Sequence, residues 1–226
     1  MTLNKLNNKI VQCRQCTRLV NFREKIAIEK RRQYIDQDYW GKPITGYGDP
    51  KAKLLMIGLA PAAHGGNRTG RVFTGDKSAS FLFDCLFEAG LANQPTSMHK
   101  NDGLKLFNMY LTTALKCVPP EDKPTSLELK TCFVYFEKEI QFLKQITIIV
   151  ALGKIAFDAC INFYKQKHKI QNKDYVFKHG KKFLLPDNKI LFGSYHPSPR
   201  NVNTGRINKL KMLILLKKIK KMLGNQ

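Results

Sequence analysis

The sequence predicts an α/β fold, a three-layer α/β/α sandwich around a central parallel sheet of four strands. Four apolar runs of strand length lie along the chain, at residues 51–60, 106–115, 145–153 and 188–196. None of them alternates cleanly between apolar and polar residues, which is typical of parallel strands that are covered on both faces. Segments of helical pattern separate the runs, so right-handed crossovers should place helices on both faces of the sheet.

Four helical segments separate and follow these strands, at residues 78–91, 126–144, 153–166 and 204–223. We expect the first to begin at Ser78 as its N-terminal cap and to stop at Gly90. The second opens with Ser126 and carries apolar residues at near-helical spacing. The last is rich in lysine, with Met, Leu and Ile on one side. Such a helix is able to lie on a membrane, but we expect its apolar face to dock on the sheet.

The composition is that of a globular protein with a strongly basic surface. The 226 residues are 43% hydrophobic and carry 39 Lys+Arg against 17 Asp+Glu, a formal net charge of +22. A polyanion is the natural partner of such a chain, either nucleic acid or an anionic membrane surface. Its apolar runs are shorter than the ~20 residues that cross a bilayer, which excludes an integral membrane protein. No secretory signal is visible at the N-terminus, so we expect a cytoplasmic protein.

We expect residues 1–226 to form a single domain, since the length suits one core and no flexible linker or repeat interrupts it. Residues 1–50 are predicted to be a basic extension of helix and loop.

The six cysteines fall into two groups. Cys85 and Cys160 lie in apolar helical segments, where a free cysteine usually serves as a small buried hydrophobic residue. The other four lie in polar, proline-rich or terminal surroundings: Cys13, Cys16, Cys117 and Cys132. The first two form a C-x-x-C pair, which lets two thiolates reach one ion. Four sulfur ligands suit zinc or an iron–sulfur cluster. The long separation of the second pair favours a cluster mildly, but spacing alone does not choose.

Two loops that follow strands carry the most unusual residues. The first, GLAPAAHGGNRTGRVFTGDKS at residues 58–78, combines glycines with four polar side chains: Asn67, Arg68, Arg71 and Asp76. Glycines permit close approach of a ligand to the backbone, yet the loop is neither a Walker A loop nor a dinucleotide fingerprint. The second, SYHPSPRNVNTGR at residues 194–206, places His196 at the end of the last strand. Ligand sites of such sheets form beyond the carboxyl ends of the strands, so we predict the site there.

These two loops resemble the signature motifs of the uracil-DNA glycosylase superfamily, and above all those of its fifth family, the B-type enzymes with an iron–sulfur cluster. The resemblance covers nearly the whole chain, including the C-x-x-C pair and KCVPP followed by a fourth cysteine. It implies a four-stranded parallel sheet between helices. It also implies hydrolysis of the N-glycosidic bond of uracil in DNA, which leaves an abasic site for base excision repair. Members of this family also accept other deaminated bases, so hypoxanthine and xanthine are further expected substrates.

The resemblance implies a role for several residues of this chain. Asp76 should activate or orient the attacking water, His196 should stabilise the leaving uracil anion, and Phe73 should stack on the flipped base. Other residues expected at the substrate are Gly58, Ala60, Ala62, Thr113 and Asn201. One [4Fe–4S] cluster with a structural role is expected on the four cysteines: Cys13, Cys16, Cys117 and Cys132.

The basic surface should supply the DNA contacts. Because both signature loops face the strand ends, four arginines are our candidates for phosphate contacts: Arg68, Arg71, Arg200 and Arg206. The expected partner is DNA that contains a deaminated base, and DNA binding would associate the protein with the nucleoid. We expect a monomer that has no membrane partner.

The chain departs from the superfamily pattern at three places. Several families have Asp or Asn in the GLAPA segment, whereas this chain has Ala60 and Ala62, which leaves the water chemistry to Asp76. Other families read uracil with an Asn after the second strand, where Thr113 stands here, and the loss of that amide favours a broader substrate range. Arg200 follows HPSP where many relatives have Leu, so the wedge that enters the duplex is not identified.

Two other classes of function are consistent with the same composition. A non-catalytic, zinc-binding protein with a basic face would bind nucleic acid, but a carboxylate such as Asp76 in its phosphate-facing loop would weaken that binding. A hydrolase of free nucleotides would not need so basic a surface.

Overall fold

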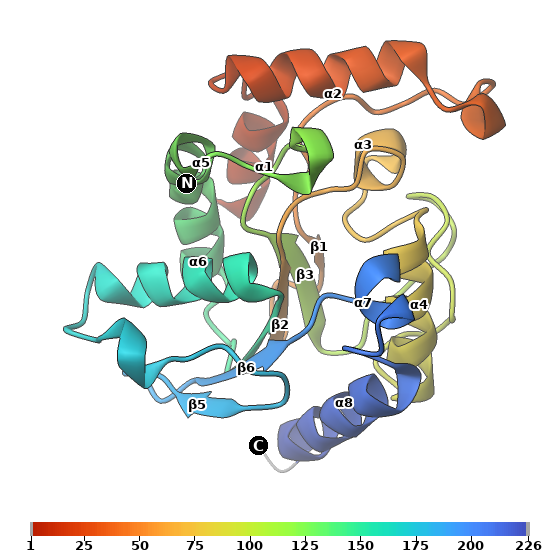
Figure 1. Cartoon of the computed structure of the whole chain (residues 1–226). Helices are drawn as coiled ribbons and strands as arrows, with labels where there is room; N and C mark the ends of the chain where they lie inside the picture. Colours follow the sequence, from red (N-terminus) through yellow and green to blue (C-terminus); the bar gives the residue numbers. More distant parts are fainter. Residues whose placement is uncertain (1, 225–226) are drawn as a thin grey trace.

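The computed structural model describes residues 2–224 and contains a six-stranded sheet with helices on both faces (Figure 1). The strand order is β1-β3-β2-β4-β6-β5. The strands are β1 (Tyr47–Gly48), β2 (Leu54–Gly58), β3 (Met109–Thr113), β4 (Ile148–Leu152), β5 (Lys182–Leu184) and β6 (Ile190–Ser194). β3, β2, β4 and β6 pair in parallel, which confirms the predicted parallel sheet as the centre of a larger one. β1 and β5 extend it as antiparallel edge strands, which the sequence analysis did not predict.

The helices alternate with the central strands, as the sequence predicts. They are α1 (Leu3–Val11), α2 (Thr17–Glu29), α3 (Gly66–Thr69), α4 (Lys77–Glu88), α5 (Ser126–Phe142), α6 (Lys154–Lys165), α7 (Pro199–Asn203) and α8 (Lys209–Gly224). Short 3-10 turns lie at Arg32–Tyr34, Pro120–Asp122 and Asn172–Asp174. The four predicted helices correspond to α4, α5, α6 and α8.

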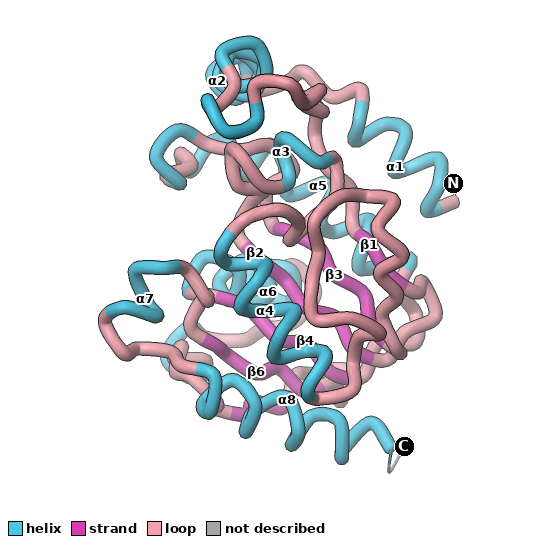
Figure 2. The backbone as a smooth tube through the Cα atoms, turned by 90° about the vertical axis from the view of Figure 1, so that its right-hand side faces the viewer, coloured by secondary structure: helices cyan, strands magenta, loops and turns pink. Residues whose placement is uncertain are grey.

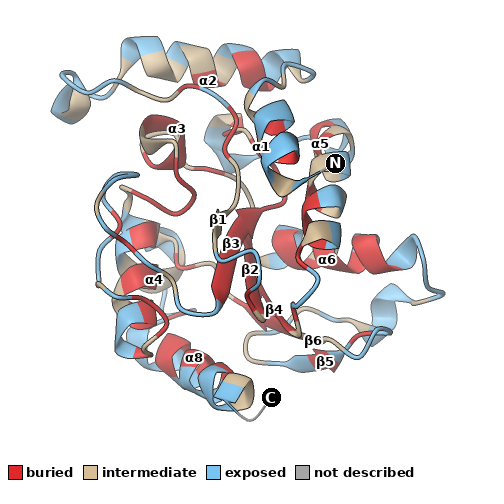
Figure 3. Cartoon of the chain, turned by 180° about the vertical axis from the view of Figure 1, so that it is seen from behind, coloured by how far each residue is buried: buried red, intermediate tan, exposed pale blue. Residues whose placement is uncertain are grey.

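Each central strand sends alternate side chains into two separate apolar layers. In β2, Leu54 and Met56 join the cluster beneath α4 and α8, whereas Leu55 and Ile57 join the cluster beneath α5 and α6. Figure 2 shows α4 and α8 in front of the strands and α6 behind them. In Figure 3 the central strands are buried along their length, and the helices carry their buried residues on one side. Burial on both faces is why the sequence of these strands lacks a clean alternation.

The N-terminus of α4 differs from the prediction in a way that concerns the site. The helix begins at Lys77, and its N-cap is Asp76 rather than Ser78. An aspartate is as good a cap as a serine, because its side chain accepts from the unpaired N–H groups of the first turn. α5 has a full capping box, in which Thr125 and Glu128 each bind the other's backbone N–H.

The C-terminal helix α8 docks on the body of the protein. Its buried residues Met212, Leu215, Leu216 and Ile219 join the same apolar cluster as α4. The lysines that alternate with them are exposed. Within residues 2–224, no helix has the length and apolar character needed to cross a membrane.

The basic N-terminal extension, residues 1–50, is packed onto the body over the part that the structure describes. α1 lies on α5, where Leu6 and Ile10 are fully buried. α2 crosses above α1 and α3 (Figure 1) and contacts α3. Cys85 and Cys160 are fully buried, which confirms their predicted role as core residues.

Candidate active site and cysteine pocket

The two signature loops leave the sheet at the carboxyl ends of β2 and β6, two parallel strands with β4 between them. Gly58 ends β2 and pairs in register with Thr113 at the end of β3. Beyond this pair the Ala114 N–H donates to the Gly58 carbonyl at 2.9 Å, so the two chains stay together as they leave the sheet. β6 ends at Ser194 on the other side of β4, two residues before His196. Crossover topology therefore brings both loops to one edge, where such sheets form their ligand sites.

The Phe73 ring lies over Gly58 and faces the ring of His196. The two ring centroids are 6.3 Å apart and the ring planes differ by 29°. Phe73 has a φ of +48°, in the left-handed region that a bulky residue rarely adopts. A Cβ atom on Gly58 would lie 2.5 Å from Phe73 Cζ, so only glycine lets the ring settle on this backbone. The strained backbone of Phe73 and the lack of a side chain at Gly58 together position the aromatic ring beside His196.

The His196 imidazole is kept neutral by its surroundings. Burial lowers the pKa of His196 to about 4. The loop around it is fixed internally, because the Asn201 side-chain amide donates to the His196 carbonyl at 2.8 Å and Ser198 caps α7. A neutral imidazole still carries one N–H, which can donate a hydrogen bond to a developing anion. Asn201 thus supports the histidine through its amide nitrogen, and its contact with substrate stays a prediction.

Asp76 lies beside the first signature loop and holds it to α4. Its Oδ1 accepts from the Ala79 N–H at 3.0 Å. Its Oδ2 occupies the space above Gly65, since a Cβ atom there would lie 2.1 Å from that oxygen. Burial raises the pKa of Asp76, and hydrogen bonds from Ala79 and Ser78 oppose the shift. The cap fixes one carboxylate oxygen and so orients the other, which is compatible with a catalytic role.

The structure contradicts the expectation that Arg68 and Arg71 contact phosphate. Both side chains are buried, with 7% and 4% of their surfaces exposed. Arg68 donates to the carbonyls of His64 and Gly75 and to the side chain of Gln37, so every guanidinium nitrogen has a partner. These arginines hold the signature loop in shape from inside.

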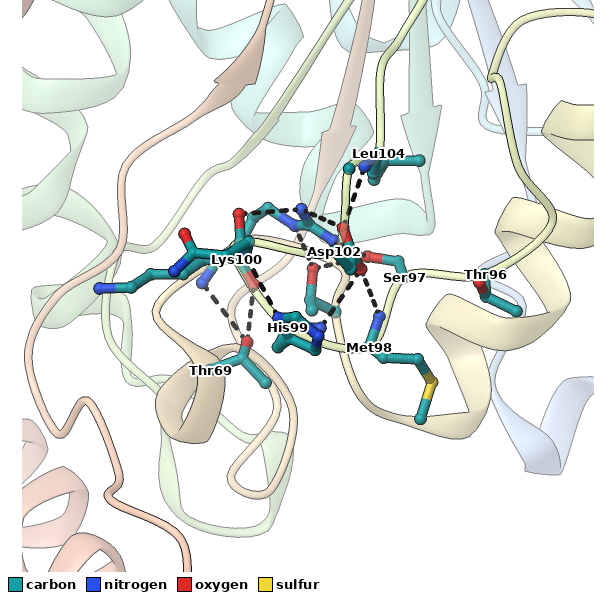
Figure 4. A network of polar contacts seen from close by, with 12 residues as sticks. Thr69, Thr96, Ser97, Met98, His99, Lys100, Asp102 and Leu104 are labelled. Carbon is teal, nitrogen blue, oxygen red and sulfur yellow. Dashed lines mark hydrogen bonds and ion pairs between the residues drawn. The ribbon is translucent and has the colours of Figure 1, made fainter.

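Arg71 ties the signature loop to the loop between α4 and β3. Its guanidinium binds both oxygens of Asp102, at 2.9 and 2.7 Å, and donates to Ser97 and Thr74. Asp102 also accepts from backbone N–H groups of its own loop, as Figure 4 shows for Met98, His99 and Leu104. A buried charge needs such a partner, and no local sequence pattern indicates that Asp102, 31 residues further along the chain, supplies it.

Arg200 and Arg206 differ from this pair because both are exposed on the second signature loop. Neither forms an ion pair with a carboxylate among residues 2–224. They stay candidates for phosphate contacts.

Ala60 and Ala62 shape the loop mainly through their small size and backbone. Ala62 accepts from the N–H groups of Gly65 and Asn67, at 3.2 and 3.1 Å, which closes the turn into α3. Ala60 packs against the small apolar cluster of Leu19, Leu115 and Cys132. Ala60, which is expected at the substrate, therefore also borders the cysteine region.

The four cysteines of the second group line one pocket. It lies between the N-terminal segment, residues 115–117 and α5, and its cysteines are Cys13, Cys16, Cys117 and Cys132. Within residues 2–224, no three His, Cys, Asp or Glu side chains converge as ligands of a single metal ion. A four-iron cluster takes one thiolate at each iron, so its ligands surround a volume and do not converge on a point. Four sulfurs around one pocket fit that arrangement.

The electrostatics of the pocket also fit a cationic group. Burial raises the pKa of Cys117 to about 11 and that of Cys132 to about 12, so these thiols stay protonated unless a cation binds them. Two donors already face the sulfurs. The Lys116 N–H lies 3.3 Å from Cys132 Sγ, and Arg23 Nη1 lies 3.2 Å from Cys117 Sγ. Hydrogen bonds to sulfur are a common feature around iron–sulfur clusters.

Two residues that join the extension to the site, Tyr39 and Arg23, were not among the predicted site residues. The Tyr39 hydroxyl and His64 Nδ1 lie 2.9 Å apart, which fastens the extension to the first signature loop. Arg23 is buried beside the cysteines, and its carbonyl accepts from the Asn67 side chain at 3.2 Å. Arg23 lies in a helix that follows the C-x-x-C pair, and nothing in the sequence distinguishes it from the exposed arginines.

Comparison with known proteins agrees with this geometry. Residues 45–220 match the family model of the uracil DNA glycosylase superfamily. A "Type-5 uracil-DNA glycosylase" of Thermus thermophilus is 41% identical over 215 residues, which cover 95% of each chain. One of Pyrobaculum aerophilum is 41% identical over 200 residues, covering 88% of this chain and 84% of its own. A "Type-4 uracil-DNA glycosylase" of Sulfurisphaera tokodaii is 26% identical over 202 residues, covering 87% of this chain and 74% of its own.

Proposed function

This chain belongs to the uracil DNA glycosylase superfamily, and on that premise we propose that it removes uracil from DNA by hydrolysis and leaves an abasic site. Relatives that are named uracil-DNA glycosylases and align over nearly the whole chain support this activity. The observation that carries the proposal is the pairing of the Phe73 ring, which lies over Gly58 at the end of β2, with the ring of His196. An aromatic face beside a neutral imidazole suits a planar base that leaves as an anion.

We propose a separate role for each of three residues in the reaction. The target nucleotide leaves the duplex, at a cost of roughly a few kcal/mol, and its base stacks on Phe73. The bond between C1′ and the base breaks, and its electron pair moves onto the uracil ring. The neutral His196 donates an N–H to the developing anion. Water adds to the oxocarbenium-like sugar, oriented by the Asp76 oxygen that the helix cap leaves free, and loses its proton toward that carboxylate.

The four cysteines that line the pocket would hold a [4Fe–4S] cluster in a structural role. When bound, the cluster would supply a cross-link between the N-terminal segment and α5, so its binding energy becomes folding energy. Anaerobically purified protein should be brown with about four irons per chain. Replacement of Cys85 or Cys160 by Ser should leave the iron content unchanged, since both lie in the apolar core.

The proposed substrate range is wider than uracil. Thr113 stands at the strand end and is buried, and a threonine cannot make the two-point amide contact that would read one base strictly. We therefore propose that hypoxanthine and xanthine are also removed. We further propose that the protein acts as a monomer on cytoplasmic, nucleoid DNA, with Arg200 and Arg206 on the phosphates.

A cleavage panel tests the proposed function. Labelled duplexes, each with one uracil, hypoxanthine, xanthine or undamaged base, are incubated with the protein and then treated with alkali to cut abasic sites. Strand scission at uracil is expected, with weaker scission at the other deaminated bases and none at undamaged ones. Tight binding to all duplexes without scission would contradict the proposed activity and would indicate a non-catalytic nucleic-acid-binding protein.

A further inference from the structure

Arg23 is a buried cation without a close carboxylate. Its side chain is only 2% exposed. The nearest carboxylate oxygen, Glu24 Oε1, lies 3.9 Å from Nη2, and both oxygens of Glu24 are already bound by Arg14. An arginine side chain does not lose its proton in proteins, and a buried charge costs several kcal/mol unless an opposite charge compensates it. The described carboxylates do not provide that compensation at close range.

What Arg23 does contact is the cysteine pocket. Nη1 donates to Cys117 Sγ at 3.2 Å, and Nη2 donates to the Cys13 carbonyl at 3.2 Å. The third nitrogen, Nε, is buried and has no hydrogen-bond partner within residues 2–224. One guanidinium thus spans the two chain segments that carry the first and third pocket cysteines.

We propose that Arg23 is the buried counter-ion and positioning residue of the cysteine-held cluster. The proposal rests on the [4Fe–4S] cluster proposed above. Four thiolates outweigh the positive charge of an oxidised four-iron core, so the loaded pocket is anionic, and Arg23 is the buried guanidinium that faces it. The guanidinium lowers the energy of the negative site and fixes the geometry of Cys13 and Cys117 at the same time.

Arg23 also links the cluster to the signature loop. Its carbonyl accepts from the side chain of the buried Asn67, whose own carbonyl accepts from the Gly41 N–H at 3.0 Å. Asn67 lies in α3, two residues after Gly65, the glycine whose lack of a side chain makes room for Asp76. Correct placement of Arg23 by the cluster therefore supports the loop that carries the catalytic residues.

Two variants of Arg23 separate its charge from its shape. Arg23→Met removes the charge and both contacts, so the midpoint potential of the cluster should fall, because a positive charge stabilises the more reduced state of any couple. The chelator concentration that removes half the iron should fall by about 10- to 100-fold, the usual effect of losing a partner of a metal ligand. Arg23→Lys keeps the charge but cannot reach both partners, so it should keep the potential near the parental value and still release iron more easily.

The matched control is Lys25→Met, which removes one positive charge two residues along the same helix from an exposed side chain. It should change neither the potential nor the iron retention. If Arg23→Met does not fold, Arg23→Lys decides by its iron retention alone. Variants of Arg23 that match Lys25→Met in both readouts would overturn the proposal. Parental protein without iron would instead refute the cluster itself, and with it the proposed cofactor.

Discussion

His196 is held neutral at the centre of the site, and that state has a consequence for stability. Burial lowers the pKa of His196 to about 4, whereas an unfolded histidine has a pKa of about 6.5. Between these two pH values His196 is protonated in the unfolded chain and neutral in the folded chain. Stability from this residue is therefore full above pH 6.5 and is lost as the pH falls toward 4.

His196→Gln tests this reasoning, because glutamine cannot titrate. The free energy of unfolding of the parental protein, relative to this variant, should be constant above pH 6.5 and should fall by at most about 3 kcal/mol between pH 6.5 and 4. Denaturant unfolding of both proteins over that range gives the difference, in which all other titrating groups cancel. A relative stability that rises toward acid would mean that the imidazole is charged in the folded protein.

Phe73 contributes an aromatic face, and its loss should affect capture of the base. Phe73→Ala should weaken binding of a uracil-containing duplex by roughly 1–3 kcal/mol, the value of stacking one base. Binding of an undamaged duplex should barely change, since no base is flipped there. Phe107→Ala, at an exposed phenylalanine on the approach to β3, is the control. Equal loss on both duplexes would show that Phe73 serves only the packing around Gly58.

Some residues of the site are predictable from the sequence and others are not. The loop that carries Asp76 and Phe73 is predictable, because glycines and polar residues after a buried strand are a local pattern. Arg68 and Arg71 were expected to contact DNA, but both are buried. Their partners Gln37 and Asp102 lie about thirty residues away in the chain, and no local pattern announces such pairs.

At the scale of elements, a buried ion pair fixes α5 to β3 beside the cysteine pocket. Lys116 Nζ lies 2.6 Å from Glu139 Oε2, with side chains 2% and 0% exposed. The same carboxylate accepts from Gly46 N–H and from the hydroxyls of Tyr110 and Thr112. Since Cys117 follows Lys116 and Cys132 lies on α5, this pair sets the distance between two pocket walls.

Breaking this pair on one side should be costly. Lys116→Met should lower the free energy of unfolding by about 3–5 kcal/mol, because it leaves Glu139 charged and buried. Adding Glu139→Gln to the same chain should recover part of that loss, since the amide still accepts hydrogen bonds without a charge. Lys154→Met removes an exposed lysine that is paired with Asp158 and should cost under about 1 kcal/mol. Denaturant unfolding measures all three, and a double variant less stable than Lys116→Met would contradict the argument.

The elements themselves were largely predictable, and the exceptions have physical reasons. All four central strands and the four main helices follow from apolar runs and helical spacing. β1 and β5 have only two and three residues, too few for any pattern to register. Serine and aspartate are equally common N-cap residues, so the sequence does not choose between Ser78 and Asp76. The geometry of the turn after Gly75 makes Asp76 the N-cap of α4.

At the scale of the whole molecule, the charge of +22 should dominate DNA affinity. Binding should weaken with salt, with a log–log slope of about −4 to −7 for some five to eight phosphate contacts. Arg200→Gln combined with Arg206→Gln should reduce the magnitude of the slope by about 2. Lys169→Gln combined with Lys173→Gln, on the exposed connection between α6 and β5, removes the same charge and should leave the slope nearly unchanged. A slope that neither pair alters would place the phosphates elsewhere on the surface.

The central claim is that Asp76 orients the water that completes uracil removal, while also capping α4. Asp76→Asn tests it directly, because asparagine caps a helix as well as aspartate but carries no charge. In single-turnover cleavage of a duplex with one uracil, the variant should be ~10²–10⁴ slower than the parental protein, with an unchanged melting temperature. Asp76→Ala should be similarly slow and also lose about 1 kcal/mol of stability. An Asp76→Asn protein that cleaves at the parental rate would contradict the catalytic assignment and leave the carboxylate with its structural role alone.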